Sequence, residues 1–443
     1  MLYNDPVTVQ HAAMGFVEAF TSRTGKPGDQ DAMMASSAPK PTEIPAEPSS
    51  FSGVRFIEDV FSQAVRMGAS DVHLEPTESG MRVRLRIDGH FVELTTAEEE
   101  QKAPIVARVK ILAGLKIDET RLPQDGKANF IDEMTKKEVD MRVSSIPTIY
   151  GEKIVVRLLK KQAENLDLRS IGMLPMNMVK IKQYLKSSYG LILVVGPTGS
   201  GKSTTLYSML SSYDTHDRNI STLEDPVEYR IPGVNHTQIN SQIGFSFAEG
   251  LRSLLRQDPD ILMVGEIRDS ETAHLAVEAS ITGHLVFSTI HANSTVNTLQ
   301  RLTNLGIDPL LVISSLKLII SQRLARTLCP HCKISYKPEI PVRDKIVARI
   351  GRYLNDKENF LLYRVNPEGC EKCGKKGHKG RTGFFEVLEM TEGLEKLVLS
   401  RASKTQLEIQ AIGDGMISMR DDALFKAVLG EVSLEEVLHV IGT

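Results

Sequence analysis

A glycine-rich segment near the middle of the chain constrains its fold more than any other sequence feature. Residues 196–204 read GPTGSGKST and directly follow an apolar run, Leu191–Val195. The pattern G-x-x-x-x-G-K-[ST] between a strand and a helix is typical of a P-loop, in which backbone amides and the helix dipole surround phosphate. The lysine of such a loop reaches the β- and γ-phosphates, and the serine binds Mg²⁺. We therefore expect ATP to be bound by Gly196, Pro197, Thr198, Gly199, Ser200, Gly201, Lys202, Ser203 and Thr204, with Ser203 as the Mg²⁺ ligand.

The composition indicates a folded protein of several domains. The chain has 443 residues, of which 41% are hydrophobic and 25% charged, and its formal net charge is −3. Generic polyanion binders usually carry a basic excess, so nucleic acid is not an expected partner. The sequence shows neither a membrane-spanning apolar run nor the pattern of a secretory signal, so we expect a cytoplasmic location.

The residue patterns predict five parts along the chain. The first fifty residues are rich in proline, serine and alanine, which is typical of an extended linker. We expect a flexible tail and linker over 1–50, an α/β domain over 51–163, a P-loop core over 164–326, a tetracysteine module over 327–385 and a helical region over 386–443.

The domain over 51–163 combines helical and alternating patterns. Along the strand predicted over 81–87, Arg82, Arg84 and Arg86 share one face, and apolar residues occupy the other. Three arginines on one face repel one another unless phosphate or an acidic neighbour lies close; the alternative is a solvated basic face. We also predict helices over 51–67 and 104–113, a turn over 122–126, and strands over 138–143 and 153–158.

The P-loop core repeats a pattern of strand, loop and helix. Its apolar runs are short and do not alternate, as expected for strands buried on both faces of a parallel sheet. We therefore predict an α/β fold in which helices cover such a sheet. The predicted strands span 191–195, 220–223, 261–264 and 285–288.

Acidic residues and one histidine follow the predicted core strands. Glu266 comes just after one strand, and Glu224 and Glu228 come after another. Because parallel strands end at one edge of the sheet, these groups should meet the phosphates there. Glu266 is suited to the Mg²⁺ shell or to polarising water. One of the acids after the other strand, preferably Glu224 and otherwise Glu228, is suited to the role of general base. His291 is a candidate γ-phosphate sensor, although a lone histidine is more often structural.

All four cysteines lie in two Cys-x-x-Cys pairs. The spacing of Cys329, Cys332, Cys370 and Cys373 fits a closed tetrahedral site, so we predict a structural Zn²⁺. An unmetallated or redox pair of motifs is the alternative.

The order of the motifs resembles that of the type II secretion and type IV pilus assembly ATPases. Four segments resemble the Walker A, aspartate, Walker B and histidine boxes of that family. They are GPTGSGKST (196–204), TLEDPVEYR (222–230), LRQDPDILMVGEIRD (255–269) and TGHLVFSTIHAN (282–293). The segments ASDVHLEP (69–76), RLRIDG (84–89), RLPQDGK (121–127), SSIPTIYGEKIVVRLL (144–159), QRLARTLCPHC (322–332) and GRTGFFEVLEM (380–390) extend the resemblance over residues 51–443.

The resemblance implies a RecA-like core, a PAS-like N-terminal domain and a homohexameric ring on the cytoplasmic face of the inner membrane. Turnover of Mg²⁺-ATP would drive pilin or pseudopilin assembly through a membrane platform protein. Arginines of a neighbouring N-terminal domain would complete each site, and the candidates here are Arg84, Arg86, Arg142 and Arg157. The cysteine motif separates the chain from retraction ATPases, whereas the long first N-terminal domain of secretion ATPases is expected to be absent.

Two other functional hypotheses compete with that of an assembly motor. One is a conjugative or nucleic-acid transport ATPase of the same P-loop superfamily. An aromatic content of 5% without tryptophan argues against it, because single-strand binding relies on aromatic stacking. The other hypothesis is a scaffold that binds ATP without hydrolysing it. The presence of the full set of expected site residues argues against this hypothesis: Lys202, Glu224, Glu266 and His291.

Overall fold

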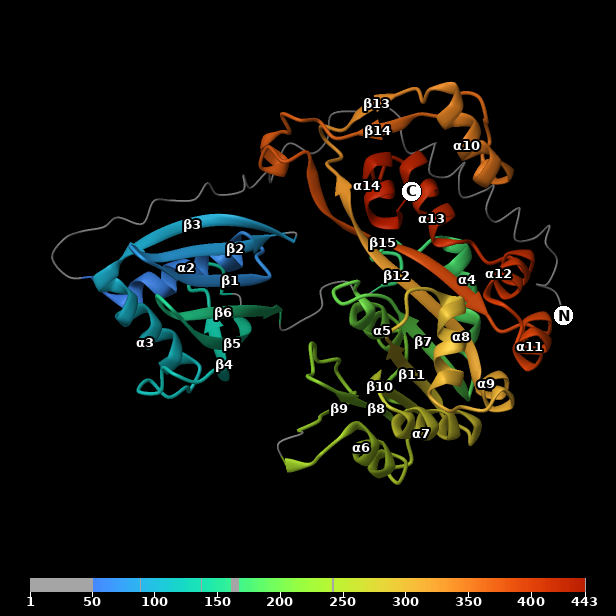
Figure 1. Cartoon of the computed structure of the whole chain (residues 1–443), viewed down its shortest axis with the longest axis horizontal. Helices are drawn as coiled ribbons and strands as arrows, with labels where there is room; N and C mark the ends of the chain where they lie inside the picture. Colours follow the sequence, from blue (N-terminus) through green and yellow to red (C-terminus); the bar gives the residue numbers. More distant parts are fainter. Residues whose placement is uncertain (1–50, 88, 137, 161–166, 241–242, 443) are drawn as a thin grey trace. The chain divides into compact units, whose positions relative to one another are not determined.

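The computed structural model describes residues 51–87, 89–136, 138–160, 167–240 and 243–442. The tail predicted over 1–50 lies outside this part. The described residues form two compact units, one that ends at residue 160 and one that begins at residue 167 (Figure 1).

The N-terminal unit is an antiparallel sheet with two helices packed on one face. Its elements are α2 (Gly53–Arg66), β1 (Asp71–Thr77), β2 (Gly80–Ile87), β3 (His90–Glu98), the 3-10 turn η2 (Glu99–Gln101), α3 (Lys102–Leu112), β4 (Gln124–Ile131), β5 (Glu138–Thr148) and β6 (Gly151–Lys160). The strand order is β3-β2-β1-β6-β5-β4. Both predicted helices and the three predicted strands are confirmed.

Alternation along β2 sets which residues enter the core of this unit. Val83 and Leu85 are fully buried and pack with Phe61 of α2, whereas the arginines of β2 lie on the other face. Helix α2 is capped by Ser52, whose hydroxyl accepts a hydrogen bond from the amide of Arg55 at 3.4 Å. This cap satisfies one of the free amides of the first turn.

The turn predicted over 122–126 is wrong in part, because β4 already begins at Gln124. The side-chain amide of Gln124 donates to the carbonyl oxygens of Lys116 and Glu119 at 2.9 and 2.7 Å. Gly126 lies in the strand, where a Cβ atom would stand 2.4 Å from the carbonyl oxygen of Ala113. Close packing against the end of α3 therefore explains this glycine better than a turn does.

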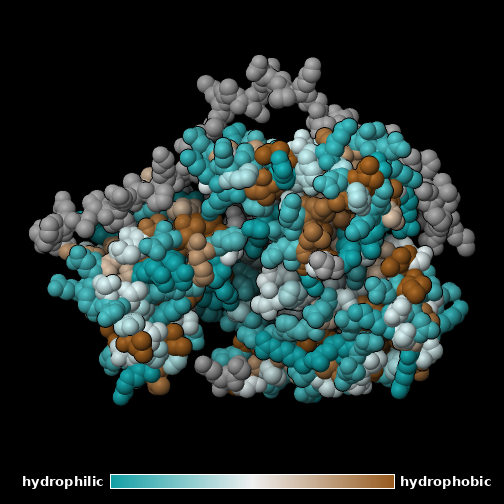
Figure 2. Space-filling view, turned by 45° about the horizontal axis from the view of Figure 1, so that its top comes forward, coloured by the Kyte–Doolittle hydropathy of each residue, from teal (hydrophilic) through white to brown (hydrophobic). Residues whose placement is uncertain are grey.

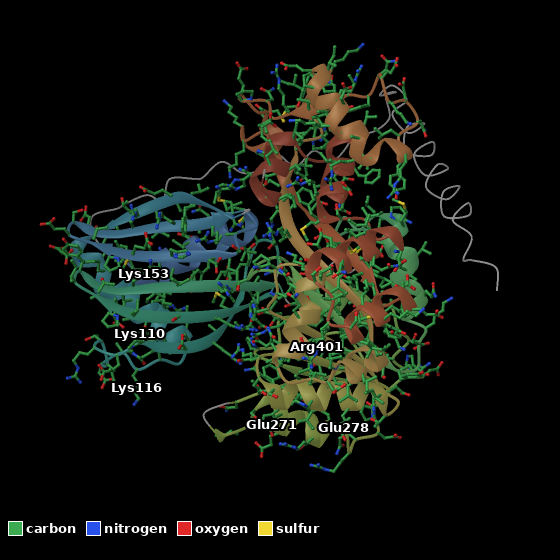
Figure 3. All side chains as sticks on the ribbon, turned by 45° about the vertical axis from the view of Figure 1, so that its right-hand side comes forward. Lys110, Lys116, Lys153, Glu271, Glu278 and Arg401 are labelled. Atoms are coloured by element: carbon green, nitrogen blue, oxygen red, sulfur yellow. The ribbon has the colours of Figure 1, made fainter. Side chains whose placement is uncertain are left out.

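A buried ion pair fastens the loop after α3 to the sheet. Lys110 of α3 is fully buried; its Nζ lies 2.6 Å from Glu152 and donates to the carbonyl oxygen of Glu119 at 2.8 Å. Figure 3 labels Lys110 in this unit. Loss of either charge would leave the other buried without its partner, which is costly.

The second unit is a sheet of seven strands in the order β15-β12-β7-β11-β10-β8-β9. Its strands are β7 (Gly190–Val195), β8 (Ile220–Glu224), β9 (Asn235–Gln238), β10 (Ile261–Ile267), β11 (Leu285–Ile290), β12 (Leu316–Leu328) and β15 (His378–Glu389). All neighbours are parallel except β12 and β15. The four predicted core strands and their parallel arrangement are confirmed.

Helices cover both faces of this sheet. They are α4 (Pro175–Tyr184), α5 (Lys202–Leu210), α6 (Phe247–Leu254), α7 (Ser270–Ile281), α8 (Thr295–Asn304), α9 (Pro309–Ser315), α10 (Ile340–Ile350), α11 (Glu392–Leu399), α12 (Lys404–Gly413), α13 (Met419–Val428) and α14 (Leu434–Ile441). The apolar cluster with Leu206 fills one side of the sheet, and that with Leu299 the other. Figure 3 shows Glu271 and Glu278 on the outer side of α7, away from the sheet.

Strands β12 and β15 were not predicted. They form a long antiparallel ladder that extends the sheet beyond β7. Only cysteine pairs and helices had been expected beyond residue 326, and the helices α11 to α14 of that region are confirmed. Because β15 crosses residue 385, the boundaries within 327–443 stay predictions. Cysteine-bearing segments lie next to a small sheet of β13 (Ile334–Tyr336) and β14 (Leu362–Arg364).

Among the described residues, no helix is both long enough and apolar enough to pass through a bilayer. On the face shown in Figure 2, hydrophobic residues form separate patches among hydrophilic ones.

Candidate nucleotide site

The P-loop connects β7 to α5 and has the backbone that its glycines allow. Gly199 and Gly201 have φ angles of +78° and +87°, which other residues rarely adopt. A Cβ atom on Gly196 would stand 2.3 Å from the carbonyl oxygen of Gln322 on β12. The hydroxyl of Thr205 donates to the side-chain oxygen of Gln322 at 2.6 Å, which fixes α5 to β12. The loop is thus held against the neighbouring strand.

The polar groups of the loop fit a phosphate ligand. The Oγ of Ser200 is buried and has no hydrogen-bond partner, so a phosphate oxygen would satisfy it. The Nζ of Lys202 donates to the carbonyl oxygens of Gly196 and Pro197, each at 3.1 Å. Burial lowers the pKa of Lys202, and the charge of Glu266 acts against that shift. Ser203 is exposed at the start of α5, where a Mg²⁺ ligand is needed.

Glu266 and His291 meet at the carboxyl edge of the sheet. Glu266 lies near the end of β10, and His291 directly follows β11. The Nε2 of His291 lies 3.4 Å from a carboxylate oxygen of Glu266. The structure therefore places Glu266, His291 and the cation of Lys202 in one electrostatic neighbourhood, as the sequence predicted from their strand ends.

Arg268 is a member of this site that the sequence analysis overlooked. Its guanidinium donates to Glu266 and lies 4.0 Å from Asp225. The hydrogen bond to Glu266 raises the pKa of Arg268. The only sequence signal was its position two residues after Glu266, on the same side of an extended chain.

Glu224 is enclosed by protein side chains. It is only 3% exposed. One of its oxygens accepts from the hydroxyl of Thr222 at 2.6 Å and from His236 Nδ1 at 2.8 Å, and the other accepts from the hydroxyl of Tyr207. His236 Nε2 accepts from the amide of Ile231 at 3.0 Å, so its proton is on Nδ1, which faces Glu224.

Tyr207 links the buried Glu224 to the segment that carries Glu228. Tyr207 lies on α5 and is fully buried. Its hydroxyl oxygen accepts from the amides of Glu228 and Tyr229 at 3.3 and 3.5 Å. Burial, and then the charge of Glu224, raises the pKa of Tyr207. Glu228 itself is half-buried.

The predicted arginines share one face of the N-terminal sheet with two buried acids. Arg84 donates to Glu75 at 2.8 Å, and Arg157 donates to Asp71 at 2.9 Å. Arg86 lies 3.8 Å from Asp71, and the guanidinium groups of Arg84 and Arg86 both lie 4.1 Å from the centre of the Phe91 ring.

The acids on that face neutralise part of its charge. Burial alone would raise the pKa of Glu75, but hydrogen bonds from Arg84 and Lys153 hold it at about 2. Arg142 is the cross-strand neighbour of Arg157 on β5. Acidic neighbours in the same chain thus relieve the repulsion predicted among these arginines, a role that the sequence analysis gave to phosphate or to an acidic neighbour.

The four cysteines converge on one point. Their Sγ atoms all lie within 4.8 Å of one another, and the pairs 329/370, 332/373 and 370/373 are 3.8, 3.9 and 3.7 Å apart. Sulfurs bound tetrahedrally about 2.3 Å from Zn²⁺ would lie about 3.8 Å apart, so the arrangement fits a closed zinc site. The amides of Cys370 and Gly377 donate to the Sγ of Cys373 at 3.1 and 3.2 Å, which favours its thiolate.

The largely parallel sheet, the P-loop after β7 and the acids at the carboxyl edge of the sheet define a P-loop nucleotide-binding protein. Solved structures support this fold. The ATPase DotB of Legionella pneumophila aligns with a TM-score of 0.63 at 20% identity, covering 89% of this chain and 96% of that one. The ADP-bound pilus retraction motor PilT aligns with a TM-score of 0.58 at 24% identity, covering 86% and 96%.

The chain belongs to the family described as type II/IV secretion system protein, whose model matches residues 49–439. It is 42% identical over 387 residues to the type II secretion system ATPase E of Vibrio cholerae, covering 87% of this chain and 75% of that protein. It is 44% identical over 385 residues to the type IV pilus assembly ATPase PilB of Myxococcus xanthus, covering 87% and 67%. It spans 43% of the PilB of Thermus thermophilus, at 40% identity.

Proposed function

We propose that this chain is a Mg²⁺-dependent ATPase that powers assembly of a type IV pilus or a type II secretion pseudopilus. The observation that carries the proposal is the P-loop with Lys202 beside Glu266 and His291, in a family whose relatives are named ATPases of both systems.

The site supports in-line hydrolysis of the terminal phosphate. Lys202 and the loop amides hold the β- and γ-phosphates, and Ser203 with Glu266 would hold Mg²⁺, which neutralises developing charge. A carboxylate takes a proton from the attacking water, and the oxygen of that water forms a bond to the γ-phosphorus. The bond between the γ-phosphorus and the β–γ bridging oxygen breaks, and ADP leaves. His291 senses the γ-phosphate from beside Glu266.

We assign the general base to Glu228, and not to the initially favoured Glu224. The carboxylate of Glu224 is buried and accepts three hydrogen bonds from side chains, so it lacks access to water. Glu228 is partly exposed, and its backbone is positioned by Tyr207, which Glu224 holds in turn. Glu228→Gln should abolish turnover and spare nucleotide binding, whereas a turnover near the normal rate would refute the assignment.

We further propose that the working unit is a homohexamer in which arginines act across subunits. Arg84 and Arg86 lie in a unit separate from the P-loop and pair with Glu75 and Asp71 of the same chain, so a phosphate bound by a neighbouring subunit would compete with these acids. Chains with Arg84→Ala and Arg86→Ala, mixed with Lys202→Ala chains, should regain activity where intact halves meet. Activity no greater than the sum of the separate mutants, with mixed rings verified, would contradict action across subunits.

We also propose that the chain works in the cytoplasm, attached peripherally to the inner membrane through a platform protein of the pilus or secretion machine, and that it binds no nucleic acid. The names of the relatives, which are ATPases of these two systems, support this proposal. Four cysteines at tetrahedral spacing would hold a structural Zn²⁺. Turnover assays with and without DNA test the assignment: activity should need Mg²⁺ and Lys202, whereas strong stimulation by DNA would favour a nucleic-acid motor.

A further inference from the structure

A polar cavity of about 330 Å³ lies in the second unit. It opens between β12, β15 and the helices that follow them, next to the segment Asn293–Ser294 that comes after His291. Its lining residues are Asn293, Ser294, Ser321, Arg323, Arg349, Glu386, Glu408, Ser418, Met419, Arg420 and Ile441.

Three arginines and two glutamates line this cavity. Of the three arginines, only Arg349 forms an ion pair, with Asp421 at 2.7 Å. Neither Arg323 nor Arg420 has an ion-pair partner among the described residues; one guanidinium nitrogen of Arg323 donates to the carbonyl oxygen of Val440 at 2.6 Å. The guanidinium groups of Arg323 and Arg420 can therefore still pair with a bound anion.

Two buried groups at the cavity have unmet hydrogen-bonding capacity. The Oγ of Ser321 is without a hydrogen-bond partner although the residue is 1% exposed, and the Nε of Arg323 is likewise buried and unsatisfied. Buried polar atoms of native proteins are almost always satisfied, and a ligand with acceptor oxygens would supply the partner that each of these two atoms lacks.

Two helix N-termini also contribute to the cavity. Ser294 caps the N-terminus of α8 and Ser418 caps that of α13, and both of these residues line the cavity. Glu386 stands between the two helices, where its carboxylate accepts from the amides of Thr295 and Met419 at 3.2 and 3.4 Å. Its negative charge is thus already stabilised by the helix ends. The exposed Glu408 is the second acid of the lining.

We propose that this cavity binds a phosphate group, supplied either as free phosphate or by a small phosphate monoester. A phosphate offers several oxygens in a tetrahedral arrangement, which can accept at once from Arg323, Arg420 and the hydroxyl of Ser321. A flat carboxylate would satisfy fewer of these donors. The volume leaves room for a small organic part beside the phosphate.

The position of the cavity gives the ligand a route to the nucleotide site. Ser321 and Arg323 alternate along β12 with Gln322, whose side chain contacts Thr205 and whose backbone supports Gly196. Successive residues of a strand face opposite sides, so one strand separates the cavity from the P-loop. A phosphate bound in the cavity would thus contact the strand that packs against the P-loop.

The test measures phosphate binding away from the P-loop. In full-length Lys202→Ala protein, calorimetric titration with inorganic phosphate, at an ionic strength held constant with chloride, should show one site per chain. Adding Ser321→Ala and Arg420→Gln should weaken that affinity at least tenfold. Ser321→Ala removes only an unsatisfied hydroxyl and Arg420 is exposed, so folding is preserved, and a thermal melt checks this.

Arg301→Gln is the matched control, since Arg301 is exposed on α8 and does not line the cavity. It should leave the affinity unchanged. A parallel titration with AMP separates the sources: tighter binding than phosphate indicates a monoester, and weaker binding indicates free phosphate. The proposal is overturned if neither anion binds better than chloride, or if the two cavity substitutions leave the affinity as it was.

Discussion

Tyr207→Phe tests how the buried acid of the aspartate box contributes to the site. The substitution removes one hydroxyl while keeping the ring that fills the space between α5 and β8. The lost hydrogen bond goes to Glu224, which is 3% exposed, so water cannot replace it. Hydrogen bonds to charged groups contribute about 1.5–3 kcal/mol, and we expect a loss of about 2 kcal/mol in the free energy of unfolding. For a unit of this size that corresponds to a fall in Tm of roughly 5 °C.

The same substitution should slow turnover without weakening nucleotide binding. The amides of Glu228 and Tyr229 lose their acceptor, so the proposed base is less well positioned, whereas the P-loop amides are untouched. A loss of about 1.4 kcal/mol in transition-state stabilisation corresponds to about a tenfold fall in kcat. Nucleotide affinity, measured by fluorescence titration, should stay within about twofold.

Tyr213→Phe provides a matched control. The hydroxyl of Tyr213 donates to the neutral carbonyl oxygen of Leu185 at 2.7 Å, away from the aspartate box. We expect a smaller destabilisation, of about 1 kcal/mol, and normal turnover. If both variants lost the same stability and kept the same kcat, the link from Tyr207 to Glu228 would have no role in positioning the base.

Three further perturbations test other parts of the structure. Glu266→Gln should bind ATP normally but lower turnover by at least a hundredfold, because the amide keeps the shape and loses the charge; normal steady-state turnover would remove Glu266 from the mechanism. Protein purified without chelator should contain about one Zn²⁺ per chain, and Cys332→Ser should lower that metal content. If the unmutated protein contained less than about 0.3 metal ions per chain, the proposed zinc site would be ruled out. The pKa of Glu75 is about 2, below its unfolded value, so its contribution to stability is present above about pH 4.5 and is lost as the pH falls toward 2. Glu75→Gln should therefore flatten the acid limb of the unfolding profile, and an unchanged slope would contradict the network.

The positions of the site residues at the ends of the core strands were predictable from sequence, because they depend on short local patterns. A run such as Leu191–Val195 followed by a glycine loop specifies strand, turn and helix within a dozen residues. Parallel strands then bring Glu266 and His291 together whatever the remainder of the chain does. The clustering of the four cysteines was predictable for a similar reason, since the pairs have the spacing of metal ligands.

Features that depend on distant pairing were not predictable. Residues 316–328 mix apolar and basic residues without strict alternation, and they form a strand because β15, more than fifty residues later, pairs with them. Tyr207 reads as an ordinary core aromatic on a helix until Glu224 is seen beside it. The favoured role of Glu224 changed for the same reason, because sequence position says nothing about which acid is buried.

The hydrogen-bonded ladder of β12 and β15 connects the P-loop to the cysteine cluster. Gln322 of β12 supports the P-loop, and Cys329 follows the last residue of the same strand about 20 Å further on. A hydrogen-bonded pair of strands resists stretching, because lengthening it would break ladder bonds. Any displacement of the P-loop along this strand must therefore move the cysteine cluster by nearly the same amount. The cysteine cluster is thus placed to transmit movements of the nucleotide site to whatever is attached at the far end of this strand.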